Sequence, residues 1–74
     1  MRKQSFKLFD AVAILEDLPD RKIVYGQVGT IIEILSDGVF EVEFSNKTGE
    51  TIAEFAVKEE SLLLLHHEIE YSEK

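Results

Sequence analysis

Residues 26–44 read GQVGTIIEILSDGVFEVEF, and this stretch decides the fold. Two segments rich in β-branched and aromatic residues flank Ser36-Asp37-Gly38, which is typical of the turn that closes a β-hairpin. The remaining strands are interpreted as packing around this hairpin.

The loop of the hairpin can hold two or three residues, and the choice decides which face is buried, because side chains alternate with period two. A two-residue loop would place isoleucines opposite glutamates. With Ser36, Asp37 and Gly38 in the loop, one face stays apolar, so we predict this register, with Gly38 in the left-handed conformation. The predicted pairs are Ile34 with Phe40, Ile32 with Val42 and Thr30 with Phe44.

Three further strands are predicted at residues 10–15, 51–57 and 61–65. A four-residue loop at 46–49 would pair Phe44 with Thr51 and Phe40 with Phe55. Residues 58–60 are interpreted as one 3₁₀ turn; a short helix over 57–65 is the local alternative.

The segment 16–25 contains Pro19, the only proline, and is interpreted as a surface loop. We expect it to pack Leu18, Ile23 or Tyr25 back onto the sheet. Phe6, Leu8 and Phe9 are possible anchors for the preceding segment.

We therefore predict an all-β fold, a small SH3-like antiparallel barrel of about five strands. Its expected limits are residues 9–65, after a flexible lead-in at 1–8 and before a charged tail at 66–74. The predicted core comprises Val12, Ile14, Val28, Ile32, Ile34, Phe40, Val42, Phe44, Phe55 and some of residues 62–65.

The composition limits the partners. Fifteen acidic and eight basic residues give a formal net charge of -7. Nucleic-acid affinity depends on neutralising phosphates, so a nucleic acid is not the expected partner and a neutral or basic protein is. The chain has no cysteine and no apolar run of about 20 residues, so no disulfide and no membrane helix are expected. An intracellular, cytoplasmic location is the corresponding prediction.

Several positions resemble a family of small uncharacterised bacterial and cyanobacterial proteins with an SH3-like barrel. The matching positions are Asp10, Val12, Leu15, Leu18-Pro19, Gly26, Gly29-Thr30, Gly38, Glu41-Val42-Glu43-Phe44 and Leu62 to Leu65. The resemblance implies that this chain is one of a pair with another small protein, as an antitoxin-like or accessory subunit.

The Gly26 to Ile32 segment is also similar to the KOW motif of ribosomal and transcription proteins and to the barrel of the nitrile hydratase beta subunit. The KOW similarity implies nucleic-acid binding as the alternative function. The basic residues available for it are Arg2, Lys3, Lys7, Arg21 and Lys22.

Catalytic, cofactor and metal sites are not predicted. His66 and His67 are adjacent, and adjacent residues on a strand point to opposite faces, so they are interpreted as part of a solvated tail. Glu41 and Glu43 share a sheet face, which offers no pocket for acid–base chemistry. We therefore predict that the chain is not an enzyme.

The outer face of the hairpin is the predicted partner-binding surface. In the predicted registers, Glu33, Glu41 and Glu54 lie side by side. Their neighbours in the next row are Glu43 and the isoleucines at 31 and 52. One interpretation is a solubility surface that discourages edge pairing. The other is an acidic and apolar face that docks a basic partner. The predicted contact residues are Glu33, Glu41, Glu43, Glu54, Ile31 and Ile52.

Overall fold

The computed structural model describes residues 5–65; the terminal stretches 1–4 and 66–74, with Arg2, Lys3, His66 and His67, lie outside the described residues. The fold is all-β, as predicted. The described residues form five strands: β1 (Ala11–Ile14), β2 (Val28–Ser36), β3 (Val39–Ser45), β4 (Thr51–Lys58) and β5 (Leu62–Leu64). The same part of the chain contains two short 3₁₀ turns, η1 (Pro19–Arg21) and η2 (Glu59–Ser61).

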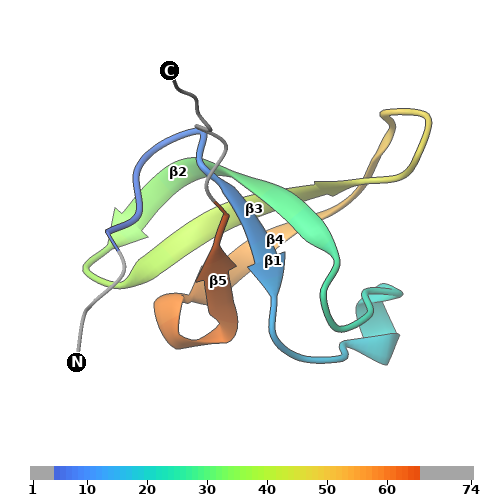
Figure 1. Ribbon diagram of the computed structural model, residues 1–74, viewed down its shortest axis with the longest axis horizontal. Coiled ribbons are helices and arrows are strands. Elements are labelled where there is room, and N and C mark those ends of the chain that lie inside the picture. Colours follow the sequence, from blue (N-terminus) through green and yellow to red (C-terminus); the bar gives the residue numbers. More distant parts are fainter. Residues whose placement is uncertain (1–4, 66–74) are drawn as a thin grey trace, which may run out of the picture.

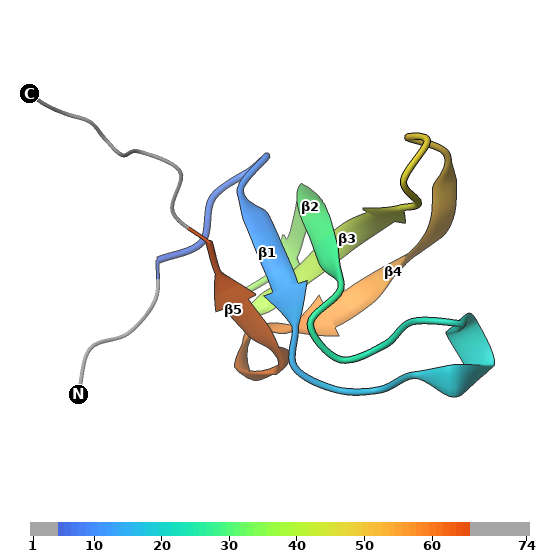
Figure 2. The same cartoon turned by 45° about the vertical axis from the view of Figure 1, so that its right-hand side comes forward.

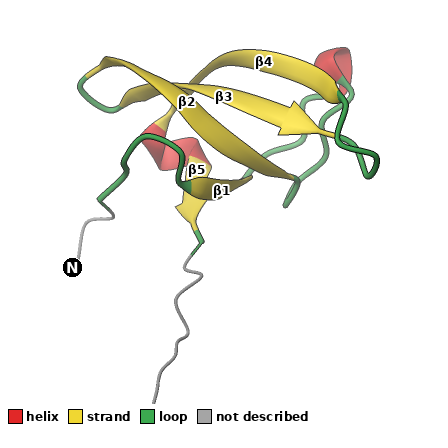
Figure 3. Cartoon of the chain, turned by 90° about the horizontal axis from the view of Figure 1, so that it is seen from above, coloured by secondary structure: helices red, strands yellow, loops and turns green. Residues whose placement is uncertain are grey.

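All strand pairs are antiparallel, and the strands are ordered β4-β3-β2-β1-β5 in one sheet (Figure 1). The sheet folds over on itself, so that β2, β3 and β4 form one layer and β1 and β5 lie beneath it (Figure 3). The long strand β2 belongs to both layers, because residues 28–30 pair with β1 and residues 29–36 pair with β3. Within residues 5–65 no backbone pairing joins β4 to β5, so the predicted barrel is not closed.

The core fills the space between the two layers. Its centre is the inward face of β3, where Val42 and Phe44 are fully buried. Phe55 stacks on Phe44, with ring centroids 5.3 Å apart. The buried cluster comprises Val12, Ile14, Ile23, Ile31, Phe40, Val42, Phe44, Val57 and Leu62. Burial of this apolar surface is the main force that holds so small a domain together.

The connection between β1 and β2 extends away from the sheet, with η1 at its tip (Figure 2). Leu18 and Ile23 form a backbone bridge across its base. Ile23 is buried and Leu18 is partly buried, whereas Tyr25 is exposed. The expectation that this loop contributes apolar side chains to the core is therefore confirmed for Leu18 and Ile23.

The predicted register of the β2–β3 hairpin is correct only in its middle part. At the turn, Ser36 pairs with Val39, so the loop holds Asp37 and Gly38 alone and the predicted three-residue loop is wrong. Leu35 is an extra residue, a β-bulge, which restores the predicted pairing beyond it.

Ile34 lies opposite Phe40, as predicted. Ile32 is then an extra residue, a β-bulge, so Val42 lies opposite Ile31 instead of Ile32. The bulge shifts the pattern by one residue and brings Ile31 into the core.

Because of the bulge, the buried residues of β2 differ from the predicted ones. Gly29 takes the inward position near the start of the strand, opposite Phe44, and Val28 faces outward with 53% of its surface exposed. A methyl group on Gly29 would lie 2.8 Å from Phe44 and 2.8 Å from Val42. Ile34 is 50% exposed, because the end of the hairpin extends past the core, and Ile32 is half-buried.

The pairing of β3 with β4 is displaced by two residues from the prediction. Phe44 lies opposite Ala53 and Phe40 opposite Val57. The loop holds five residues between Ser45 and Thr51, and Ile52 is an extra residue in β4. The shift of two keeps the residues from Ala53 to Val57 on their predicted faces. Thr51, before the extra residue, lies opposite Ser45 and bonds to Glu43, so it is on the outward face instead of the predicted inward face.

Candidate protein-binding site

The outward face of β2, β3 and β4 gathers four glutamates. Phe40, Val42 and Phe44 fill the inward positions of β3, so the intervening Glu41 and Glu43 face outward. Glu33 lies directly opposite Glu41, as predicted. The displaced β4 register places Glu54 opposite Glu43 instead of Glu41. We call Glu33, Glu41, Glu43 and Glu54 the acidic face.

Glu41 lies at the centre of the acidic face. Its partial desolvation raises its pKa above the ordinary value of 4.5. A side-chain hydrogen bond with Glu54 raises this pKa further, as do the negative charges of Glu54 and Glu33. A hydrogen bond between two carboxyl groups requires that one of them be protonated. Glu54 therefore still interacts with Glu41, although it lies diagonally across from Glu41 on the sheet and not directly opposite.

The charge of this face is not neutralised within the fold. Glu43 accepts a hydrogen bond from the Thr51 hydroxyl, which adds no charge. No Lys or Arg of residues 5–65 forms an ion pair with these glutamates. Like charges on neighbouring strands are mildly destabilising. The described part of the fold therefore bears the repulsion among these carboxylates without a cation to offset it.

The two isoleucines predicted for this face differ in their exposure to solvent. Ile52 is 43% exposed, on the same strand as Glu54. Ile31 is fully buried, so its placement on the outer face was wrong. The prediction assumed unbroken alternation along β2, and the bulge at Ile32 reverses the faces of the residues before it.

The basic residues considered for nucleic-acid binding do not form one patch within the described chain. Lys7 belongs to the segment before β1, while Arg21 and Lys22 lie in the η1 loop on the other side of the fold (Figures 1 and 2). The Arg21 guanidinium lies 4.2 Å from the centre of the Phe55 ring, in a cation–π contact. Arg21 therefore already has a structural role.

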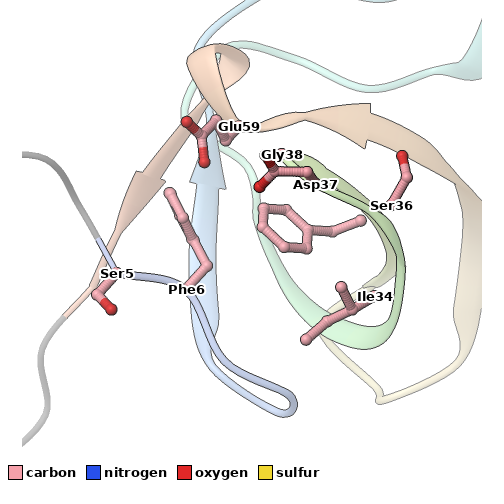
Figure 4. Close-up of a pocket in the computed structure, with 8 residues that line it drawn as sticks. Ser5, Phe6, Ile34, Ser36, Asp37, Gly38 and Glu59 are labelled. Atoms are coloured by element: carbon pink, nitrogen blue, oxygen red, sulfur yellow. The ribbon is translucent and has the colours of Figure 1, made fainter.

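Sequence reasoning missed a hollow of about 470 Å³ at the turn of the β2–β3 hairpin (Figure 4). Phe6, Ile34 and Phe40 supply its apolar surface, and Asp37 and Glu59 supply its charges. Phe6 was considered only as a possible anchor before the first strand, and Ile34 and Phe40 were predicted only as a cross-strand pair of the core. Asp37 was interpreted as turn chemistry alone, and nothing indicated that η2 would bring Glu59 beside the turn.

The family match agrees with this small β-fold. Residues 8–64 match the family described as a domain of unknown function, DUF4926. The chain belongs to this family. The predicted resemblance to an uncharacterised family is thereby confirmed. No curated protein and no solved structure matches the chain.

Residues 5–65 contain no group of three or more His, Cys, Asp or Glu side chains placed to hold a metal ion. Over the same range, no helix has the length and apolar character that crossing a bilayer requires.

Proposed function

We propose that this DUF4926 domain is a non-catalytic protein-binding module whose acidic face docks a basic protein partner. The observation that carries the proposal is the convergence of four carboxylates from three strands with no cation of the described fold to neutralise them. This is the role of an accessory or antitoxin-like subunit, in which a small acidic protein covers a basic surface on another.

The electrostatics of the face suit such a partner. A basic surface would attract Glu33, Glu41, Glu43 and Glu54 together. It would also offset the negative charges of Glu54 and Glu33, which add to the effect of desolvation on the pKa of Glu41. Complementary charge speeds the encounter of two proteins more than it tightens the final complex. Exposed Ile52 adds an apolar contact that loses water when the partner docks.

The test begins with co-purification of the partner from the native host and measures association and dissociation rates with the isolated pair. Glu41→Lys should lower the association rate about tenfold or more at low salt, because it reverses the central charge. Ile52→Ala should raise the dissociation rate several-fold, because the apolar contact is reduced. Glu60→Lys is the matched control, since Glu60 is an exposed glutamate in η2, outside the acidic face.

Unchanged rates for both Glu41→Lys and Ile52→Ala would contradict the proposal and leave the acidic face as a solubility feature. A titration of the domain with short RNA at two salt concentrations tests the alternative. Tight binding that weakens steeply with salt would favour nucleic-acid binding instead.

A further inference from the structure

We propose that the hollow at the β2–β3 turn is a second binding site, which receives one arginine or lysine side chain of a protein or peptide. The hollow is distinct from the acidic face. Ile34 and Phe40, which line it, are a cross-strand pair whose side chains lie on the opposite sheet face from the pair Glu33 and Glu41. Failure of one site therefore does not imply failure of the other.

The base of the hollow is apolar and fixed. Phe40 is a core residue with 5% of its surface exposed. The Phe6 ring packs against it, with centroids 5.2 Å apart and planes tilted by 42°. Ile34, half of whose surface is exposed, forms the facing side (Figure 4). Together these side chains offer a surface on which a chain of methylene groups can pack.

A backbone hydrogen bond positions Glu59, one of the two charged residues of the hollow. The amide of Glu59 donates a 2.8 Å hydrogen bond to the carbonyl oxygen of Gly38, which ties η2 to the hairpin turn. The Glu59 side chain then lies over Gly38, where a Cβ built on that glycine would be 3.7 Å from the carboxyl carbon. Asp37, the neighbour of Gly38 in the turn, brings the second carboxylate (Figure 4).

These features select the occupant by its chemistry. The charged side chains that line the hollow, Asp37 and Glu59, are both acidic, and within residues 5–65 neither forms an ion pair. An anionic group would be repelled, and a purely apolar group would strip water from two carboxylates without replacing it. An arginine or lysine has an aliphatic stem for the apolar base and a cationic head for the carboxylates.

The experiment uses the full chain labelled with ¹⁵N and the blocked amino acid Nα-acetyl-arginine methylamide, with the lysine equivalent as a second probe. Amide chemical shifts of Gly38, Phe40 and Glu59 should change saturably, with a dissociation constant on the order of millimolar. The norleucine equivalent has the apolar stem without the charge. It should bind at least tenfold more weakly.

The variants separate the two parts of the site. Asp37→Asn combined with Glu59→Gln should weaken binding of the arginine probe at least tenfold, and Ile34→Ser should weaken it several-fold. Ile34 is exposed, so Ile34→Ser is expected to fold, and the amide spectrum verifies folding for every variant. Glu60→Gln makes the same chemical change as Glu59→Gln one residue outside the hollow and should have no effect.

Equal binding of the norleucine probe, or unchanged binding to the Asp37→Asn and Glu59→Gln double variant, would overturn the assignment. Shifts confined to Glu33, Glu41, Glu43 and Glu54 would also overturn it, and would support the acidic face alone as the cation-binding surface.

Discussion

Strands β2 and β3 are paired along most of their length, yet they follow different rules. In β3 every second side chain is inward, and Phe40, Val42 and Phe44 are all buried. In β2 the alternation is interrupted by extra residues at Ile32 and Leu35. A polar and apolar pattern therefore predicts the faces of a strand only between its bulges, because each bulge reverses the side that later residues occupy.

The reason for the difference lies in the two layers of the sheet. Strand β3 pairs only with β2 and β4 in the upper layer, while β2 must pass from that layer to β1. A bulge bends a strand and increases its twist, which suits such a passage. Gly29 lies where β2 pairs with both layers, and a side chain at this position would meet Phe44.

The largest effect should come from comparing two isoleucines of β2. Ile31→Ala should lower the free energy of unfolding by about 2–5 kcal/mol, because it leaves a cavity in the core. Ile34→Ala, on the exposed end of the hairpin, should change the same quantity by about 0.5 kcal/mol or little more. Urea denaturation of both variants measures the difference. A cost of Ile31→Ala as small as that of Ile34→Ala would contradict the bulge at Ile32, because without the bulge Ile31 would face outward.

A glycine comparison should give an intermediate effect. Gly29→Ala should destabilise the fold by about 1–3 kcal/mol, since the new methyl group meets Phe44, Val42 and the carbonyl oxygen of Glu43. Gly38→Ala meets only the Glu59 side chain at an ordinary distance, but Gly38 has φ +78°. Its cost should be about 1–2 kcal/mol, from backbone strain alone.

Thermal unfolding distinguishes the two glycines through a second substitution. Gly38→Asn should recover part of the stability lost in Gly38→Ala, because asparagine tolerates the left-handed conformation. Gly29→Asn should be at least as damaging as Gly29→Ala. Recovery at both positions would contradict the steric explanation for Gly29.

The smallest effect concerns the outward positions of the same strands. The raised pKa of Glu41 means that the folded protein holds a proton more tightly than the unfolded chain. Stability should therefore fall as pH rises from the ordinary value of 4.5 through the raised pKa, and the penalty should be constant above it. In Glu41→Gln this decrease should be smaller, as measured by melting temperature against pH. Glu60→Gln is the control, and a profile of Glu41→Gln identical to that of the parent protein would exclude the repulsion.

Much of this fold is visible in the sequence because local chemistry specifies it. Gly38 marks the hairpin turn and has the predicted positive φ, and the alternation of β3 identifies both its buried and its acidic faces. The bulge at Ile32 has no local signal, because two consecutive isoleucines suit either face. The β3–β4 loop is one residue longer than predicted. The side-chain oxygen of Asn46 accepts hydrogen bonds from the amides of Thr48 and Glu50, which keeps Glu50 in the turn.

The candidate sites divide in the same way. Glu33 lies opposite Glu41 as predicted, because the extra residue Leu35 offsets the loop being one residue shorter than predicted. The approach of Glu54 to both β3 glutamates depends on the β4 register, and the hollow depends on three segments distant in sequence. Contacts of the second kind are set by tertiary packing, which local patterns do not determine.

The pairing of β1 with β5 has a mechanical consequence. The two strands are antiparallel, with Val12 opposite Leu64 and Ile14 opposite Leu62, so the beginning of β1 and the end of β5 lie at the same end of the pair. Tension applied through the two termini would break the backbone hydrogen bonds between β1 and β5 one after another, from the loaded end. It would not load all of them at the same time in shear. The second layer of the sheet is thus built to peel apart under a modest pull while β2, β3 and β4 are still joined.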